Sequence, residues 1–154
     1  MAAATAWRVY REFKDALGEK LVNLETDTIK CALFTNLSNC GDVALATAQY
    51  ATLNNQVANQ GAPGYETGGK TVATTWTQAA GTATLGCANP AWIATGGSIV
   101  ARFAVLYSDT AANKDLIAYC ILDATPADVT CTVGNTLTVE INASGVVTLA
   151  GAEA

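Results

Sequence analysis

The sequence contains no histidine, and this absence removes the commonest general base of enzymes. It also excludes a nucleophilic site of the Ser-His-Asp or Cys-His kind. A mechanism that uses carboxylates alone needs two of them in one cleft. The acidic residues lie instead mostly in turns or at the ends of expected strands, where aspartate is common: Asp27, Asp42, Glu66, Asp109, Asp115, Asp123 and Asp128. The sequence therefore predicts a protein that is not an enzyme and has no catalytic residues.

Motifs for metals and cofactors are also lacking. The five cysteines have no C-x-x-C spacing, and no histidine is present to complete a zinc site. Residues 64–71 do fit the phosphate-loop pattern G-x-x-x-x-G-K-T, but that motif needs a strand before it and a helix after it. Here Pro63 precedes the pattern and a strand-like run follows it. We interpret this stretch as a glycine-rich hairpin-type loop, and we expect neither a metal nor a cofactor.

Charge is sparse, at 14% of residues, with a net charge of −5. The eight basic residues are scattered rather than gathered in a stripe, so nucleic-acid binding is not expected. The longest apolar runs, such as Phe103 to Tyr107, stop at strand length, so no membrane segment is expected. The first residues lack the apolar segment of a secretory signal, which predicts folding in a cytoplasm. A length of 154 residues fits one domain, residues 1–154.

Residues 1–18 have the pattern of a helix. Trp7, Tyr10, Phe13 and Leu17 fall at spacings of three, three and four and make one apolar stripe. Gly18 occupies the place of the residue that follows a helix in the left-handed conformation. A stripe so rich in aromatic side chains must pack on something, either on its own domain or as an assembly face on a neighbouring subunit.

From residue 27 onward the apolar period becomes two, which is typical of strands. Turn residues separate short runs at intervals of about ten residues, which indicates a β-sandwich or barrel. The expected strands are 28–35, 70–78, 82–85, 91–94, 98–107, 116–122, 129–133, 136–141 and 146–149. Residues 98–107 are apolar on both faces and are expected to be central, while residues 42–60 predict a short helix or a long covering loop. The predicted fold is mostly β: an antiparallel β-sandwich or jelly-roll-like barrel over residues 27–150, with a short N-terminal helix.

The cysteines divide into two groups. Cys31, Cys120 and Cys131 lie in alternating runs, and we expect at least two of them to face inward as small hydrophobic thiols. Cys40 and Cys87 lie beside glycines in loop contexts, which predicts accessible thiols. An odd number of cysteines with exposed thiols suggests pairing between chains or a free reactive group. Cys40 and Cys87 are therefore candidates for a disulfide that joins subunits, with a reduced state or pairing within one chain as the alternatives.

Several segments together resemble a known group of proteins. They are the aromatic helix stripe, residues 24–34, 55–59, 64–70, Trp76, 91–97, 101–107, 134–139 and 142–145. In this order they resemble small virion proteins of tailed bacteriophages, over nearly the whole chain. The segments that begin at Gly64 and Ala101 are the most telling, whereas the five cysteines are not part of the family pattern.

The resemblance implies a non-enzymatic structural protein of the virion, assembled in the host cytoplasm. A capsid decoration or cement protein that binds and stabilises the outer shell fits best, and a tail, neck or fibre-base component is the alternative. The implied partners are the major capsid protein or other virion proteins, together with copies of the chain itself, a trimer being favoured. Since a phage particle leaves the reducing cytoplasm at lysis, disulfides could form afterwards.

A binding module remains a rival function. Exposed aromatic rings at Trp76, Trp92, Tyr65 or Tyr107 could form a platform for carbohydrate of the host surface. Two exposed coplanar rings in a groove would favour this reading, and buried indoles would favour the structural one.

Overall fold

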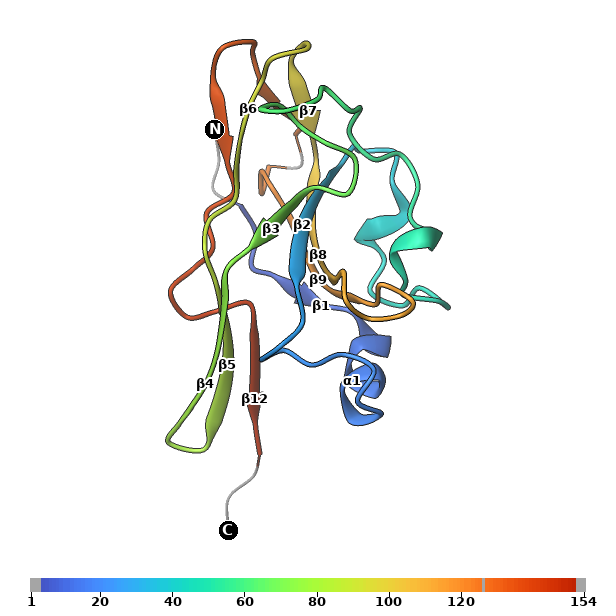
Figure 1. The fold of residues 1–154 in the computed structure, drawn as a ribbon, viewed down its shortest axis with the longest axis vertical. Coiled ribbons are helices and arrows are strands. Elements are labelled where there is room, and N and C mark those ends of the chain that lie inside the picture. The colour runs from blue at the N-terminus through green and yellow to red at the C-terminus, as the bar shows by residue number, and fades with distance from the viewer. Residues whose placement is uncertain (1–3, 126, 152–154) are drawn as a thin grey trace.

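A computed structural model describes residues 4–125 and 127–151 of the chain (Figure 1). Strands make up 37% and helices 10%, so the expected mostly β fold is confirmed, with antiparallel sheets and a helix near the N-terminus. The helical elements are α1 (Arg11–Gly18) and the single 3₁₀ turns η1 (Asn39–Gly41) and η2 (Tyr50–Thr52). The strands are β1 (Arg8–Val9), β2 (Ile29–Phe34), β3 (Lys70–Val72), β4 (Thr74–Ala79), β5 (Thr82–Cys87), β6 (Ala91–Ile93), β7 (Ile99–Ala101), β8 (Phe103–Ser108), β9 (Leu116–Ile121), β10 (Val129–Cys131), β11 (Thr136–Thr138) and β12 (Val147–Ala150).

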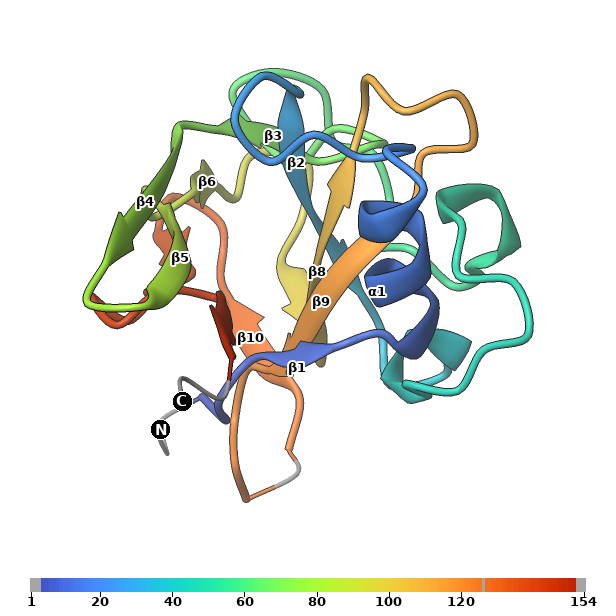
Figure 2. The same cartoon turned by 90° about the horizontal axis from the view of Figure 1, so that it is seen from below.

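The main layer is a five-stranded antiparallel sheet in the order β1-β9-β8-β2-β3. Its central strands β9, β8 and β2 are buried on both faces, which explains why their sequences are apolar at nearly every position. One face is covered by α1 and the 3₁₀ turns, and the other faces the sheet of β4, β5 and β12 (Figure 2). The prediction that residues 98–107 contribute a central strand is confirmed for β8.

The second layer is built from smaller sheets: the three-stranded sheet β12-β5-β4 and the two-stranded ribbons β10-β7 and β11-β6. Two runs that the sequence predicts as single strands are interrupted. The run predicted at 70–78 breaks at Ala73, so that β3 pairs with β2 in the main sheet while β4 pairs with β5 in the three-stranded sheet. Residues 98–107 break at Arg102, so that β7 pairs with β10 while β8 pairs with β2 and β9.

The N-terminal helix is shorter than predicted. Residues 1–3 lie outside the described part, and residues 4–10 are not helical. Thr5 donates its backbone N–H to the carbonyl of Ile121 (2.9 Å), and Tyr10 donates to the carbonyl of Ile117 (3.1 Å). The segment therefore supplies a strand neighbour to β9, whose backbone groups would otherwise lie unpaired at a buried edge. This tertiary pairing outweighs the helical spacing of the side chains.

The left-handed residue that follows the helix lies two positions later than the sequence predicted. Leu21 donates its N–H to the Ala16 carbonyl (2.9 Å), and Lys20 donates to the Leu17 carbonyl (3.3 Å). These two bonds form a Schellman motif, in which the residue in the left-handed conformation is Lys20, with a φ of 62°. Gly18 is the last residue of the helix itself, so its predicted role at the helix end is wrong.

Residues 42–60 form the covering loop that was one of the two expectations for them. Within this stretch the structure has one 3₁₀ turn, η2, and otherwise irregular chain. Tyr50 stacks on Tyr107 of β8 with ring centroids 4.4 Å apart, and its hydroxyl donates to Gln56 (2.7 Å). Aromatic packing thus holds the loop on the face of the main sheet that α1 also covers.

Candidate assembly surface

The four residues of the predicted apolar stripe have different environments. Tyr10 and Phe13 are buried in the hydrophobic core of the chain, whereas Trp7 and Leu17 are half-buried and pack against its margin. Trp7 does not belong to the helix, because it precedes β1. Of the two alternatives for this stripe, packing on its own domain therefore applies to Tyr10 and Phe13. The proposal of an assembly face is restricted to Trp7 and Leu17.

Cys40 is buried, and the prediction that its thiol is accessible is wrong. The hydroxyl of Tyr10 donates to the Cys40 carbonyl (2.5 Å), and the hydroxyl of Tyr119 donates to the Gly41 carbonyl (2.6 Å). The two tyrosines hold turn η1 against the main sheet and bury the thiol, and this burial raises the pKa of Cys40 to about 12. Glycine beside a cysteine indicated a loop correctly, but the sequence does not show which distant hydroxyls hold that loop down.

Cys87 is half-buried in β5, and burial raises its pKa to about 12 as well. None of the five cysteines forms a disulfide within the chain. Turn η1 and β5 lie on opposite sides of the main sheet (Figure 2), so Cys40 and Cys87 of one chain are not neighbours. Cys31, Cys120 and Cys131 are all buried, as the alternating pattern predicted.

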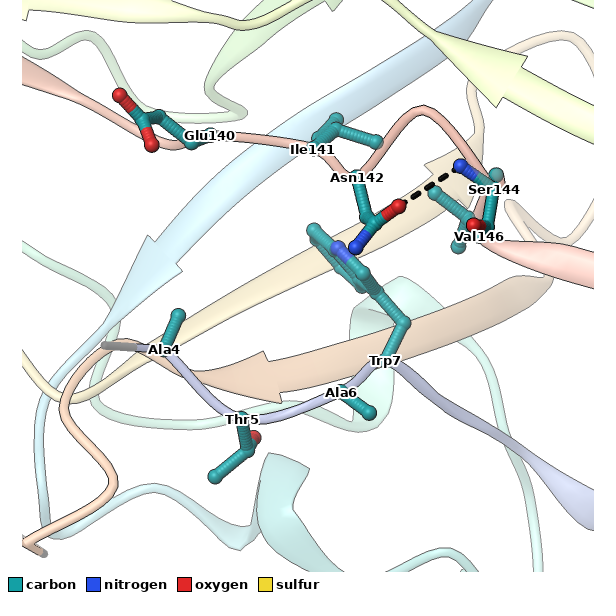
Figure 3. A pocket seen from close by; sticks show the side chains of 10 residues that line it. Ala4, Thr5, Ala6, Trp7, Glu140, Ile141, Asn142, Ser144 and Val146 are labelled. Atoms are coloured by element: carbon teal, nitrogen blue, oxygen red, sulfur yellow. Dashed lines mark hydrogen bonds between the residues drawn. The ribbon is translucent and has the colours of Figure 1, made fainter.

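A groove of about 570 Å³ surrounds Trp7 (Figure 3). One wall is the extended chain from Ala4 to Trp7, and the other is residues 140–146, where the Asn142 side chain accepts a hydrogen bond from the Ser144 N–H (2.8 Å). The indole lies against the Asn142 side of this turn in Figure 3. Trp7 thus lies where the N-terminal segment meets the chain that leads into β12.

A second groove, of about 380 Å³, lies between α1 and β12. Its α1 side is formed by Phe13, Leu17 and Gly18, and its β12 side by Val147 and Leu149. Lys14 supplies the charged group in the lining. Leu149 is 38% exposed, which is unusual for a large apolar side chain that faces such a groove.

A third groove, of about 340 Å³, shares Leu17 with the second. It extends past Lys20, Val22 and Glu25 to Trp76 on β4. Trp76, Leu85 and Val147 are cross-strand neighbours and share one face of the three-stranded sheet. We call the second and third grooves together the apolar seam; its walls are Phe13, Leu17, Val22, Leu24, Trp76, Val147 and Leu149.

The sequence identified only part of this surface. The alternation in residues 146–149 predicted the strand, and the apolar stripe included Leu17. Nothing in the sequence marked Leu149 or Trp76 as bordering the apolar seam, because their positions there depend on how the three-stranded sheet packs against α1 and the segment that follows it. A strand whose apolar residues are left partly uncovered has the same local pattern as one that is fully covered.

The aromatic residues considered for a carbohydrate platform are mostly internal. Trp92, Tyr65 and Tyr107 are buried, and Trp76 is half-buried in the apolar seam. The Tyr65 hydroxyl accepts hydrogen bonds from the Leu33 N–H (2.8 Å) and from the Gln56 side chain (2.7 Å). The three buried rings stabilise the core. A carbohydrate platform was expected to show two exposed coplanar rings, and these four residues do not provide them.

The glycine-rich segment at 64–71 leads into strand β3 and not into a helix, as the sequence interpretation expected. The Lys70 ammonium group donates to the Ala91 carbonyl, and it lies 6.0 Å from the centre of the Trp92 ring. A side chain at position 69 would collide with the Cys31 carbonyl, so the glycine allows β3 to lie close to β2. The segment therefore has a structural explanation.

The acidic residues are dispersed, in agreement with their assignment to turns. Asp109 forms ion pairs with Lys30 (3.0 Å) and Lys114 (2.5 Å), and hydrogen bonds from these lysines lower the pKa of its carboxyl group. Among the described residues, no three cysteine, histidine or acidic side chains come together as a metal site would require. In the same part of the chain, no helix is long and apolar enough to cross a bilayer.

Comparison of the chain with protein-family models, with curated proteins and with solved structures gives no match.

Proposed function

We propose that this chain is a non-enzymatic structural protein of a tailed-bacteriophage virion, most simply a decoration protein that binds and stabilises the capsid shell. The observation that carries the proposal is the apolar seam. Trp76 and Leu149 lie on the inner side of a sheet, where a closed sandwich would bury them, yet the chain leaves both partly uncovered. Apolar surface of this kind is typical of proteins that complete their packing by assembly.

The rest of the molecule supports a passive role of this kind. The central strands are buried on both faces, and the covering loop packs on the main sheet through aromatic contacts, as in a closely packed domain. Further large apolar side chains are exposed at Leu37 and Val133.

Quantitative mass spectrometry of purified particles, produced from a genome that encodes this chain, tests the proposal. A decoration protein should be present in hundreds of copies, and particles that lack it should release DNA at a lower temperature. A few copies per particle would instead indicate the neck, tail or fibre base. Absence from particles that are purified intact would refute a virion role.

A further inference from the structure

The free edge of β12 borders the apolar seam. In the three-stranded sheet β12-β5-β4, β12 pairs with β5, and the described residues place no strand on its other side. Val147, Thr148 and Leu149 of this edge strand line the groove between β12 and α1. A strand placed there would find both unpaired backbone groups and apolar side chains.

β12 also lacks the charged side chains and the proline that commonly protect an edge strand. Its sequence, Val147–Ala150, contains no charge and no proline, and it exposes Leu149. The opposite edge strand, β4, exposes the polar residues Thr75, Thr77 and Gln78 instead. The outer strands of the main sheet carry Arg8 in β1 and Lys70 in β3. Of these edges, β12 is therefore the one best suited to pair with another strand.

The charges around the apolar seam indicate which partner fits. Lys14, Lys20 and Glu25 line its two grooves, and Glu19 directly precedes Lys20 in the sequence. The two lysines are positive, the two glutamates are negative, and all four side chains are exposed. None of the four belongs to an ion pair in the described part of the chain. A rim of one sign would repel an identical rim, whereas a rim of mixed signs can meet its own copy across a two-fold axis with opposite charges facing each other.

We infer that a second copy of this chain occupies the apolar seam, with the two β12 strands paired antiparallel about a two-fold axis. Each copy places Leu149 against the other, and the two three-stranded sheets become one continuous sheet. The contact relates copies in pairs, so it differs from the trimer that the family resemblance favours. The inference deepens the proposed function, which treats the apolar seam as an assembly surface, by naming a copy of the chain as its occupant.

Sedimentation velocity of the isolated protein over a range of concentrations tests the inference. The wild-type protein should form a reversible dimer. Leu149→Lys should weaken the dimer by about a hundredfold or more, because the contact would bury an unpaired charge. Leu37→Lys is the matched control: Leu37 is more exposed, at 73%, but lies in the loop after β2, so its replacement should leave dimerisation unchanged.

Circular dichroism and thermal melting establish that both variants fold, and hydrogen exchange reports on β12 directly. In the wild-type protein the amides of residues 147–150 should exchange more slowly as the concentration rises, and in the Leu149→Lys protein they should not. A wild-type protein that stays monomeric at millimolar concentration would overturn the inference, as would a folded Leu149→Lys protein that dimerises normally. These measurements use no particles, so a monomeric protein would refute the dimer without bearing on the virion role. Conversely, absence of the chain from particles would refute the virion role even if the isolated protein dimerises.

Discussion

The end of helix α1 provides a test in which the sequence pattern and the structure predict effects of opposite sign. If Gly18 followed the helix in the left-handed conformation, alanine there would destabilise the protein by about 1 kcal/mol. In the structure Gly18 is helical, and a Cβ atom at this position would meet no atom within 4 Å. Gly18→Ala should therefore stabilise the folded state by about 0.5–1 kcal/mol, because alanine loses less backbone entropy in a helix.

Lys20 should respond in the complementary way. Its φ of 62° costs a residue with a side chain about 1 kcal/mol, and glycine avoids this cost at some loss of entropy in the unfolded chain. Lys20→Gly should stabilise the protein by about 0.5 kcal/mol, while Lys20→Ala, which keeps the strain, serves as the control. For a domain of this length 0.5–1 kcal/mol corresponds to a rise in melting temperature of about 2–3 °C.

The assay is thermal unfolding followed by circular dichroism at 222 nm, at a concentration low enough that self-association does not contribute. Gly18→Ala and Lys20→Gly should both melt above the wild-type protein, and Lys20→Ala should melt close to it. A fall in melting temperature for Gly18→Ala would refute the assignment of Gly18 to the helix and of the left-handed position to Lys20.

Three further predictions concern the core, the reactivity of the thiols and the loss of folding stability at low pH. Tyr65→Phe should lower the free energy of unfolding by about 1–3 kcal/mol in urea denaturation, because the buried Leu33 N–H loses its partner; an unchanged midpoint would contradict this role. In the native protein Cys87 should react with a thiol reagent at pH 8 about a thousandfold more slowly than a free cysteine, because its raised pKa leaves little thiolate, and the buried thiols should react only on unfolding; a fast native reaction would count against it. The lowered pKa of Asp109 stabilises the folded state above the ordinary carboxyl pKa of 3.8, and this contribution should disappear as the pH falls through the folded value. Asp109→Asn should flatten that part of the stability curve slightly, since the pair is partly exposed; a stability profile between pH 2 and 6 that matches the wild type would show that the pair contributes nothing.

The strands could be predicted well from the sequence because their side-chain period is local. Ile29, Cys31 and Leu33 alternate in the sequence and lie on one face of β2, and the turns between strands are marked by glycine and proline. Breaks inside a strand were not predictable in the same way. Ala73 and Arg102 interrupt strands because the chain changes its hydrogen-bonding partner there, and neither residue is a typical strand breaker.

The errors at the N-terminus and at Cys40 have a common physical origin. Trp7 and Tyr10 have helical spacing, yet the segment becomes extended because β9 needs a neighbour at its edge. Cys40 lies in a glycine-containing loop, yet it is buried because Tyr10 and Tyr119 donate to the backbone of that loop. In both cases the local structure is set by a hydrogen-bonding partner at least 30 residues away in the sequence. A local sequence pattern contains no information about such a partner.

The passage of residues 70–79 from one sheet to the other has a mechanical consequence (Figure 1). In a sandwich whose layers are joined only by loops, the layers can slide when a shearing load is applied, since only side-chain contacts resist. Here β3 and β4 are successive parts of one extended segment, separated by a single residue, and each is hydrogen-bonded into a different sheet. A force that pulls the three-stranded sheet away from the main sheet is therefore transmitted through covalent bonds to two ladders, β3 on β2 and β4 on β5, and one of them must rupture before the layers can part.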